Sequence, residues 1–240
     1  VRCGGFFYSE PKMPTILAID TSTHACSCAL NLGGVIVEHF EIIPRQHADR
    51  LLPMINSLMN EQGLTYTDLN AVAFGQGPGS FTGLRIAAGV TQGIAFGANI
   101  PVVSVSTLAA MALQVRKTEN DVVFSALDAR INEVYWGIYA VKSNGVSSIS
   151  NEGLCKPEEL PISVPGNPAS MIGVGSGLEF LDRMPKFYRE ILSDKMPAIY
   201  PRAGAIAELA AEHFLQGMTK QPEDISPIYL RDNVAKVSKK

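Results

Sequence analysis

Two acidic residues stand at the ends of apolar runs, where the chain passes from a predicted strand into a polar turn. Asp20 ends the run TILAID and precedes Thr21 and Ser22, and Asp128 follows the run VVFSAL. Proteins of the α/β class bind ligands outside the carboxyl ends of such strands. These two turns are therefore candidate ligand-binding positions.

The stretch from Gly75 to Arg85, GQGPGSFTGLR, stands between a predicted strand and a predicted helix. Its glycines allow the backbone to approach a neighbour closely. Ser80 can cap the helix, whose free N–H groups would suit an anion. The stretch is no Walker A loop, because that loop requires GxxxxGK[ST] and a lysine is absent here. A tight turn that packs the helix under a sheet is the alternative interpretation.

Gly89, Gly93 and Gly97 recur at four-residue spacing in the predicted helix 81–97. Each glycine costs about 1 kcal/mol relative to alanine in a helix interior, so this stripe requires a compensating close approach of another element. Either the stripe packs on the chain's own sheet, or it receives a helix of another subunit. The charged fraction is only 18%, below the usual share of soluble domains, and this favours a second subunit.

Patterns typical of hydrolytic catalysts are absent from the sequence. The histidines are His24, His39, His47 and His213, and none is followed four residues later by another. No serine stands in a GxSxG turn, and the four cysteines show no zinc spacing. The sequence therefore predicts no metal site and no catalytic residues, and it indicates no peptidase.

The hydrophobic pattern predicts the order β-β-β-α-β-α-β-α, followed by a second β-rich start. Strands are expected over 15–20, 24–32, 35–43, 71–74, 101–105, 122–127, 133–141, 146–149 and 170–173, and helices over 47–62, 81–97, 107–115 and 203–215, with a short helix at Glu158. Both halves open with a strand that brings an aspartate to a turn, which resembles the actin, Hsp70 and sugar-kinase superfamily. That resemblance implies an α/β, actin-like (ASKHA, ribonuclease-H-like) duplicated fold of two lobes, with mixed sheets flanked by helices.

The 240 residues carry 20 Lys+Arg against 23 Asp+Glu, and 46% of them are hydrophobic. Such a chain can bury a core, and its apolar stretches are too interrupted to span a membrane. The cysteine pattern favours the reducing cytoplasm. We expect a tag or non-native tail over 1–12, an N-terminal lobe over 13–105, a C-terminal lobe over 106–225 and a poorly packed polar tail over 226–240.

Three segments carry a specific resemblance to one protein family. They are LAIDTS at 17–22, RQHADRLLPMI at 45–55 and GPGSFTGLRIAAG at 77–89. These segments are similar to the bacterial TsaB (YeaZ) family, the non-catalytic paralogue of the glycoprotease-like TsaD (Kae1-like) proteins. The resemblance implies a role in making threonylcarbamoyladenosine at position 37 of tRNAs that read codons beginning with A.

The same resemblance bears on the candidate turns. TsaD paralogues hold a metal with an HxxxH pair, which this chain lacks, and both turns lack the glycine that admits a phosphate in active superfamily members. We interpret Asp20, Thr21, Ser22, Asp128 and Gly175 as a degenerate nucleotide cleft, with no cofactor or with weak or partner-dependent binding of ATP or ADP. The alternative is an ATP-dependent phosphotransferase or hydrolase of the same superfamily, which would bind Mg-ATP tightly through Asp20 and Asp128.

The expected function is that of a scaffold subunit, which activates a TsaD-like protein for threonylcarbamoyl transfer. The partner interface is expected at His47, Leu51, Leu52, Ile55, Leu58, Phe81, Arg85, Gly89, Gly93 and Gly97. A homodimer is expected when the chain is alone, and a TsaE-like ATPase is a further candidate partner. Contact with tRNA is expected only through the complex, because the few basic residues near the C-terminus form no groove-lining stripe.

Overall fold

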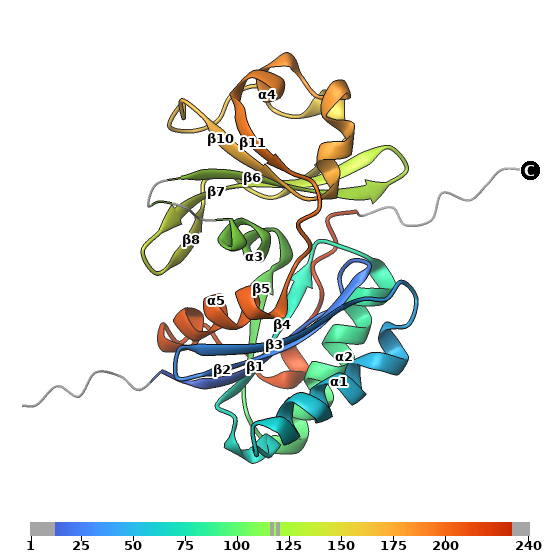
Figure 1. Ribbon diagram of the computed structural model, residues 1–240, viewed down its shortest axis with the longest axis vertical. Coiled ribbons are helices and arrows are strands. Elements are labelled where there is room, and N and C mark those ends of the chain that lie inside the picture. Colours follow the sequence, from blue (N-terminus) through green and yellow to red (C-terminus); the bar gives the residue numbers. More distant parts are fainter. Residues whose placement is uncertain (1–12, 116–117, 119–120, 232–240) are drawn as a thin grey trace, which may run out of the picture.

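The computed structural model describes residues 13–115, 118 and 121–231, which form two lobes stacked one above the other (Figure 1). Each lobe is built on one mixed sheet. Helix α3 (Thr107–Gln114) lies between the lobes, directly after the last strand of the first sheet. Within the described residues, no helix is long and apolar enough to cross a membrane.

The first sheet has the strand order β3-β2-β1-β4-β5. Its strands are β1 (Thr15–Asp20), β2 (Ala25–Leu32), β3 (Val35–Ile42), β4 (Ala71–Gly77) and β5 (Val102–Ser106). Residues 16–19 of β1 are all apolar because both faces of the sheet are covered. Leu17 and Ile19 pack with α1 (His47–Glu61) and α2 (Phe81–Ala98), whereas Ile16 and Ala18 pack with α5 (Ala203–Leu215).

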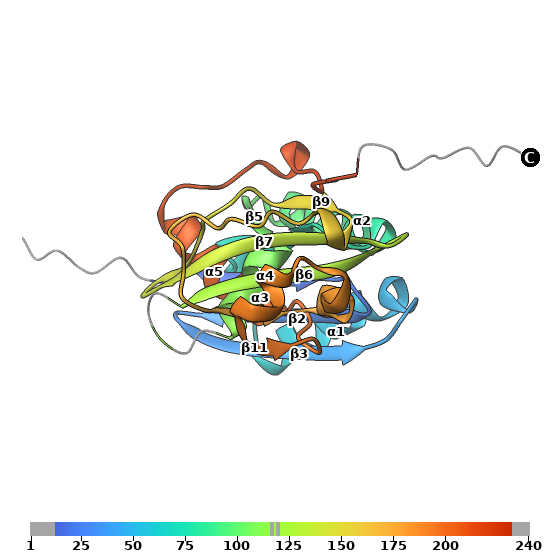
Figure 2. The same cartoon turned by 90° about the horizontal axis from the view of Figure 1, so that it is seen from above.

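The second sheet has the order β11-β10-β6-β7-β8, and β9 pairs with β7. Its strands are β6 (Val122–Arg130), β7 (Glu133–Lys142), β8 (Gly145–Ser148), β9 (Gly153–Cys155), β10 (Met171–Val174) and β11 (Leu192–Met196). Val123 and Leu127 pack with α3 on one face of this sheet. Phe124 packs on the other with the 3-10 helix Ser176–Arg183 and with Tyr188 of α4 (Lys186–Ile191). In the view from above, β6 and β7 cross the width of the molecule (Figure 2).

The two sheets share one topology. In each sheet, the first three strands pair antiparallel with one another. Two later strands then pair in parallel on the free side of the first strand. The repeated arrangement confirms the predicted duplicated two-lobed α/β fold. It also places the carboxyl ends of β1 and β6, which carry the two aspartates, at the junction of the lobes.

The predicted division of the chain into lobes is wrong at its end. α5 packs on the first sheet, so residues 203–215 belong in space to the first lobe and not to the C-terminal one. The predicted polar tail is also packed in its described part, because Ile228 N donates to Gln76 O at 2.8 Å. The expected tail over 1–12 and the remainder of the polar tail lie outside the described residues. The pattern does not predict β9, β11 or α4, which are too short to show a period.

Candidate functional site

The start of the turn after β1 is closed to solvent. Asp20 is fully buried, and its Oδ1 accepts hydrogen bonds from Ser22 N at 3.0 Å and Ser22 Oγ at 2.8 Å. Its Oδ2 has no hydrogen-bond partner among the described residues. Burial raises the pKa of this carboxyl from 3.8 to about 6, although the two hydrogen bonds from Ser22 act in the opposite direction.

The N-terminal end of α2 forms the cover of this turn. Ser80 N donates to Ser22 O at 2.7 Å, and Thr21 Oγ1 donates to Gly83 O at 2.7 Å. Ser80 also caps α2, as its sequence position predicts, by accepting a hydrogen bond from Gly83 N. Thr21 is fully buried as a result, whereas Ser22, Thr23 and His24 of this turn line the space between the lobes.

The glycines of the GQGPGSFTG stretch permit this close cover. A Cβ at Gly75 would stand 2.0 Å from Asp20 Oδ2, and a Cβ at Gly83 would stand 1.9 Å from Thr21 O. Real Cβ atoms do not come so close to other heavy atoms, so only glycine fits at these two positions. The tight-turn interpretation of the stretch therefore accounts for these glycines without a phosphate.

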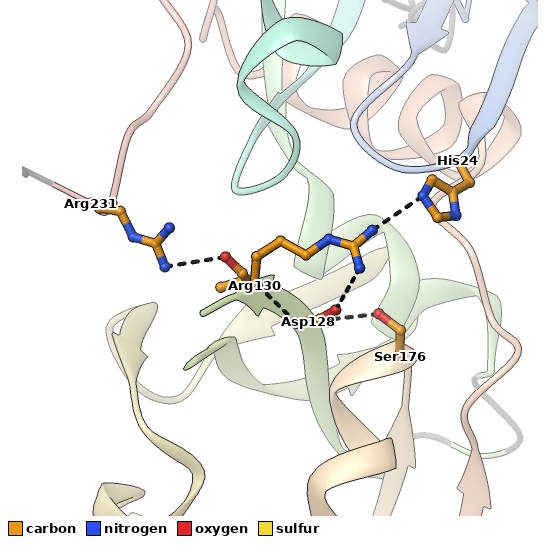
Figure 3. A network of polar contacts seen from close by, with 6 residues as sticks. His24, Asp128, Arg130, Ser176 and Arg231 are labelled. Atoms are coloured by element: carbon orange, nitrogen blue, oxygen red, sulfur yellow. Dashed lines mark hydrogen bonds and ion pairs between the residues drawn. The ribbon is translucent and has the colours of Figure 1, made fainter. Parts of the chain in front are cut away.

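The turn after β6 is open and carries a polar network that joins the lobes (Figure 3). Asp128 Oδ1 accepts a hydrogen bond from Arg130 N at 2.8 Å, and Asp128 Oδ2 accepts one from Arg130 Nη1 at 3.1 Å. Asp128 N donates to Ser176 Oγ at 3.1 Å. Arg130 Nη2 reaches His24 Nε2 of the first lobe at 3.2 Å. A guanidinium only donates hydrogen bonds, so His24 Nε2 is the acceptor in this contact.

A cleft of about 820 Å³ lies between the two lobes. Of the predicted cleft residues, Ser22 and Asp128 line it, whereas Asp20 and Thr21 lie behind its wall. Gly175 is not part of the lining either, because it packs against β6. Among the residues that the structure describes, no three His, Cys, Asp or Glu side chains gather where they could hold a metal ion.

Several lining residues escape prediction from sequence. They are Arg45, Arg130, Tyr135, Tyr200, Tyr229 and Arg231. They come from turns, from β7 and from segments near the C-terminus, so no local period connects them. Their one common signal is residue type, since all are basic or aromatic, and only the folded chain shows that they face one cleft.

Part of the predicted partner interface lies in the core of the first lobe. Leu51, Ile55 and Leu58 of α1 are fully buried, and His47 Nε2 lies 3.1 Å from a backbone oxygen of β2. The prediction is wrong at these four positions, because the apolar face of α1 covers the chain's own sheet. Leu52, on the opposite face, is 45% exposed.

The glycine stripe of α2, by contrast, faces outward. A Cβ at Gly89, Gly93 or Gly97 would meet no described atom within 4 Å beyond its own helical backbone, so no other described element packs closely on the stripe. Phe96 beside it is 75% exposed. The stripe, together with Phe96, is called here the open face of α2.

The open face continues into an aromatic stack at the start of the helix. The Arg85 guanidinium lies 3.7 Å from the centre of the Phe81 ring, and Arg85 Nε donates to Tyr229 Oη at 3.1 Å. The rings of Phe81 and Tyr229 have centroids 5.3 Å apart. Both rings remain partly exposed, so this stack borders the open face and the cleft alike.

Comparison with known proteins identifies relatives along nearly the whole chain. A family model described as "TsaD: tRNA N6-adenosine threonylcarbamoyltransferase" matches residues 22–239. The tRNA threonylcarbamoyladenosine biosynthesis protein TsaB of Escherichia coli (strain K12) is 40% identical over 222 residues, which cover 92% of this chain and 96% of that protein. The protein of the same name from Haemophilus influenzae is 38% identical over 232 residues, covering 92% and 94%.

Solved structures give the same relationship. YeaZ from Pseudomonas aeruginosa matches with a TM-score of 0.85 at 40% identity, over 91% of this chain and 100% of that one. A second structure from that organism, described as an uncharacterized protein with similarity to peptidase YEAZ, matches equally well, with a TM-score of 0.85.

Proposed function

Because this chain belongs to the TsaB (YeaZ) family and so has a role in tRNA threonylcarbamoyladenosine biosynthesis, we propose that it acts there as a non-catalytic subunit. In this proposal it docks on a TsaD-like protein through the open face of α2 and activates that protein for threonylcarbamoyl transfer to adenosine 37 of tRNA. The observation that carries the proposal is the stripe of three helical glycines that no described part of the chain covers.

The energetics of the stripe support a docking role. Three interior glycines together cost the helix about 3 kcal/mol relative to alanine. Such glycines are of use where a second helix approaches closely. This chain matches the TsaD family model over 22–239, so a TsaD-like partner would present an equivalent helix. The exposed Phe96 would add apolar area to such a contact.

The closed turn after β1 supports the absence of catalysis. In this fold a working phosphate site requires the turn to be accessible, yet Asp20 and Thr21 are fully buried under α2. Asp128, at the second turn, is already engaged by Arg130. We therefore propose that the chain is no peptidase, and that it binds ATP or ADP weakly or only together with a partner.

The same open face predicts self-association when no partner is present. Two copies would cover their glycine stripes by forming a homodimer, and a TsaD-like protein would compete for the same surface. Sedimentation at tens of micromolar should show a dimer that dissociates when the partner is added. A strict monomer under these conditions would contradict this part of the proposal.

A reconstitution experiment tests the function as a whole. A TsaD-like protein, a tRNA substrate and a threonylcarbamoyl donor are combined with and without this chain, and a TsaE-like ATPase, the further proposed partner, is added in a parallel series. We expect the chain to raise modification by the TsaD-like protein, and to show neither transfer nor ATP turnover on its own. Turnover by the isolated chain that disappears in Asp20→Asn would overturn the proposal. In the cell we place this activity in the cytoplasm.

A further inference from the structure

The cleft between the lobes is lined by aromatic rings from both sides. Tyr135 comes from the second sheet, Tyr200 from the segment before α5, and Phe81 and Tyr229 from the stack at the start of α2. A nucleic-acid base has an aromatic face whatever its identity, so rings of this kind suit bases that are not paired in a duplex.

Basic side chains cross the same cleft. Figure 3 shows Arg231, Arg130 and His24 in a row, from the C-terminal segment through the second lobe to the first. Arg45 extends this row, since Ile43 N donates to His24 O at 3.0 Å and brings the turn before α1 to the cleft. Arg45 has no ion-pair partner among the described residues.

Arg45 and Arg130 keep donors for a ligand, whereas Arg231 is engaged by Ala129 O and the Glu133 carboxylate. A guanidinium has five N–H donors in a fixed plane. Arg130 uses one on Asp128 and one on His24, and its side chain remains 68% exposed. Of the acidic residues that line the cleft, Asp128 is paired with Arg130, and Glu179 is the other.

The arrangement fits a strand better than a single nucleotide. A mononucleotide presents its phosphates at one point, and Asp20 and Thr21, which begin the turn after β1, are buried away from the cleft. Cations and aromatic rings from both lobes line this cleft together. A single strand presents spaced phosphates and unstacked bases, so it can use both kinds of side chain.

We propose that the cleft between the lobes binds a short single-stranded RNA segment, with Arg45 and Arg130 on the phosphates and Tyr135 and Tyr200 against the bases. This deepens the proposed function by giving the chain its own contact with RNA, and it departs from the expectation that tRNA is met only through the complex. It does not depend on partner docking, because the open face of α2 takes no part in it.

The test measures fluorescence anisotropy of a labelled single-stranded heptaribonucleotide with the full chain alone. We expect saturable binding with a dissociation constant on the order of 10⁻⁵–10⁻⁴ M at low salt, the range of weak phosphate-directed binding. Arg45→Gln should weaken binding several-fold and lower the dependence of binding on salt. Tyr200→Leu should weaken it about tenfold with the salt dependence unchanged, because stacking involves no counterion release.

Two comparisons make the test decisive. Arg189→Gln, an arginine of α4 outside the cleft lining, changes the net charge equally and should leave RNA binding unchanged. Circular-dichroism melts confirm that each variant is folded. Absence of RNA binding, equal loss in Arg189→Gln, or displacement of the RNA by AMP or ATP at comparable affinity would each overturn the proposal. These outcomes leave activation of a TsaD-like protein untouched, so failure here is distinguishable from failure of the proposed function.

Discussion

Asp20 of the first lobe is a buried carboxyl group with one oxygen that the described residues leave unsatisfied. Its carboxylate is fully buried, and Oδ2 finds no hydrogen-bond partner among the described residues. Its position at the end of an apolar strand is evident from sequence. The burial of Asp20 is not evident from sequence. The segments that cover it approach closely at Gly75 and Gly83, and a sequence does not show which turn a glycine-rich loop will pack against.

The burial of Asp20 predicts a specific dependence of stability on pH. The carboxyl ionises near 3.8 when unfolded and near 6 when folded. Ionisation of Asp20 therefore destabilises the folded state, by about 3 kcal/mol in full. This destabilisation is absent below the unfolded pKa and complete once the pH has risen through the folded pKa. Between pH 7.5 and pH 5, wild type should gain about 1.4 kcal/mol of unfolding free energy relative to Asp20→Asn.

Urea denaturation of both proteins across this pH range measures the difference. The variant keeps the shape of the side chain and does not titrate, so all other groups cancel in the comparison. If the unfolding free energies of the two proteins change with pH in the same way, the pKa of Asp20 is not raised in the folded state.

Two glycines of α2 should respond oppositely to alanine. Gly83→Ala forces a Cβ against Thr21 O and should cost about 1–3 kcal/mol of unfolding free energy. Gly89→Ala meets open space and should gain up to about 1 kcal/mol, because alanine is the better helix former. Denaturation at sub-micromolar concentration, where association contributes little, checks both. Equal effects of the two substitutions would contradict the packing described here.

Helices α1 and α2 show what a hydrophobic period does and does not reveal. The spacing of apolar residues predicts both helices. It does not say what covers an apolar face, and for α1 the cover is the chain's own β2, whose Cys26 and Cys28 lie in the same core. The glycine stripe of α2 was the more informative signal, because glycines are costly in a helix and the structure leaves them uncovered.

Adjacent leucines of α1 separate core from surface. Leu51→Ala removes a fully buried side chain and should cost about 2–5 kcal/mol. Leu52→Ala removes a side chain that is 45% exposed and should change stability by less than about 0.5 kcal/mol, while weakening association with a TsaD-like protein. Thermal melts and partner titrations distinguish the two. Comparable destabilisation by both substitutions would show that the helix is oriented differently.

At the scale of the whole molecule, the C-terminal segment ties the lobes together. It leaves α5, returns along α2 and reaches the second lobe, where Arg231 contacts Ala129 O and the Glu133 carboxylate. The duplicated fold itself follows from the repeated strand–aspartate pattern of the sequence. These long-range contacts cannot be predicted from the sequence, because they join residues about a hundred positions apart through single hydrogen bonds.

Loss of this tie should loosen the second lobe locally. Arg231→Gln removes a charge-assisted contact worth about 1.5–3 kcal/mol, so amide hydrogen exchange at residues 129–133 should accelerate roughly tenfold or more. Exchange in β1 and β4 should not change, and Arg189→Gln serves as the control. Unaltered exchange at 129–133 would show that the segment does not hold the lobes.

Docking of a TsaD-like protein on the open face of α2 is the central proposal, and one measurement tests it directly. Gly93→Leu fills the stripe with a large side chain, and its affinity for a TsaD-like protein is measured by titration calorimetry beside Lys186→Leu, which places a leucine on α4 at an exposed position of the second lobe. Gly93→Leu should weaken association by about 1–3 kcal/mol, roughly tenfold to a hundredfold, and the melting temperature of the monomer should not fall, because leucine is a better helix former than glycine. Lys186→Leu should bind as wild type does. Wild-type affinity in a normally folded Gly93→Leu protein would contradict the account.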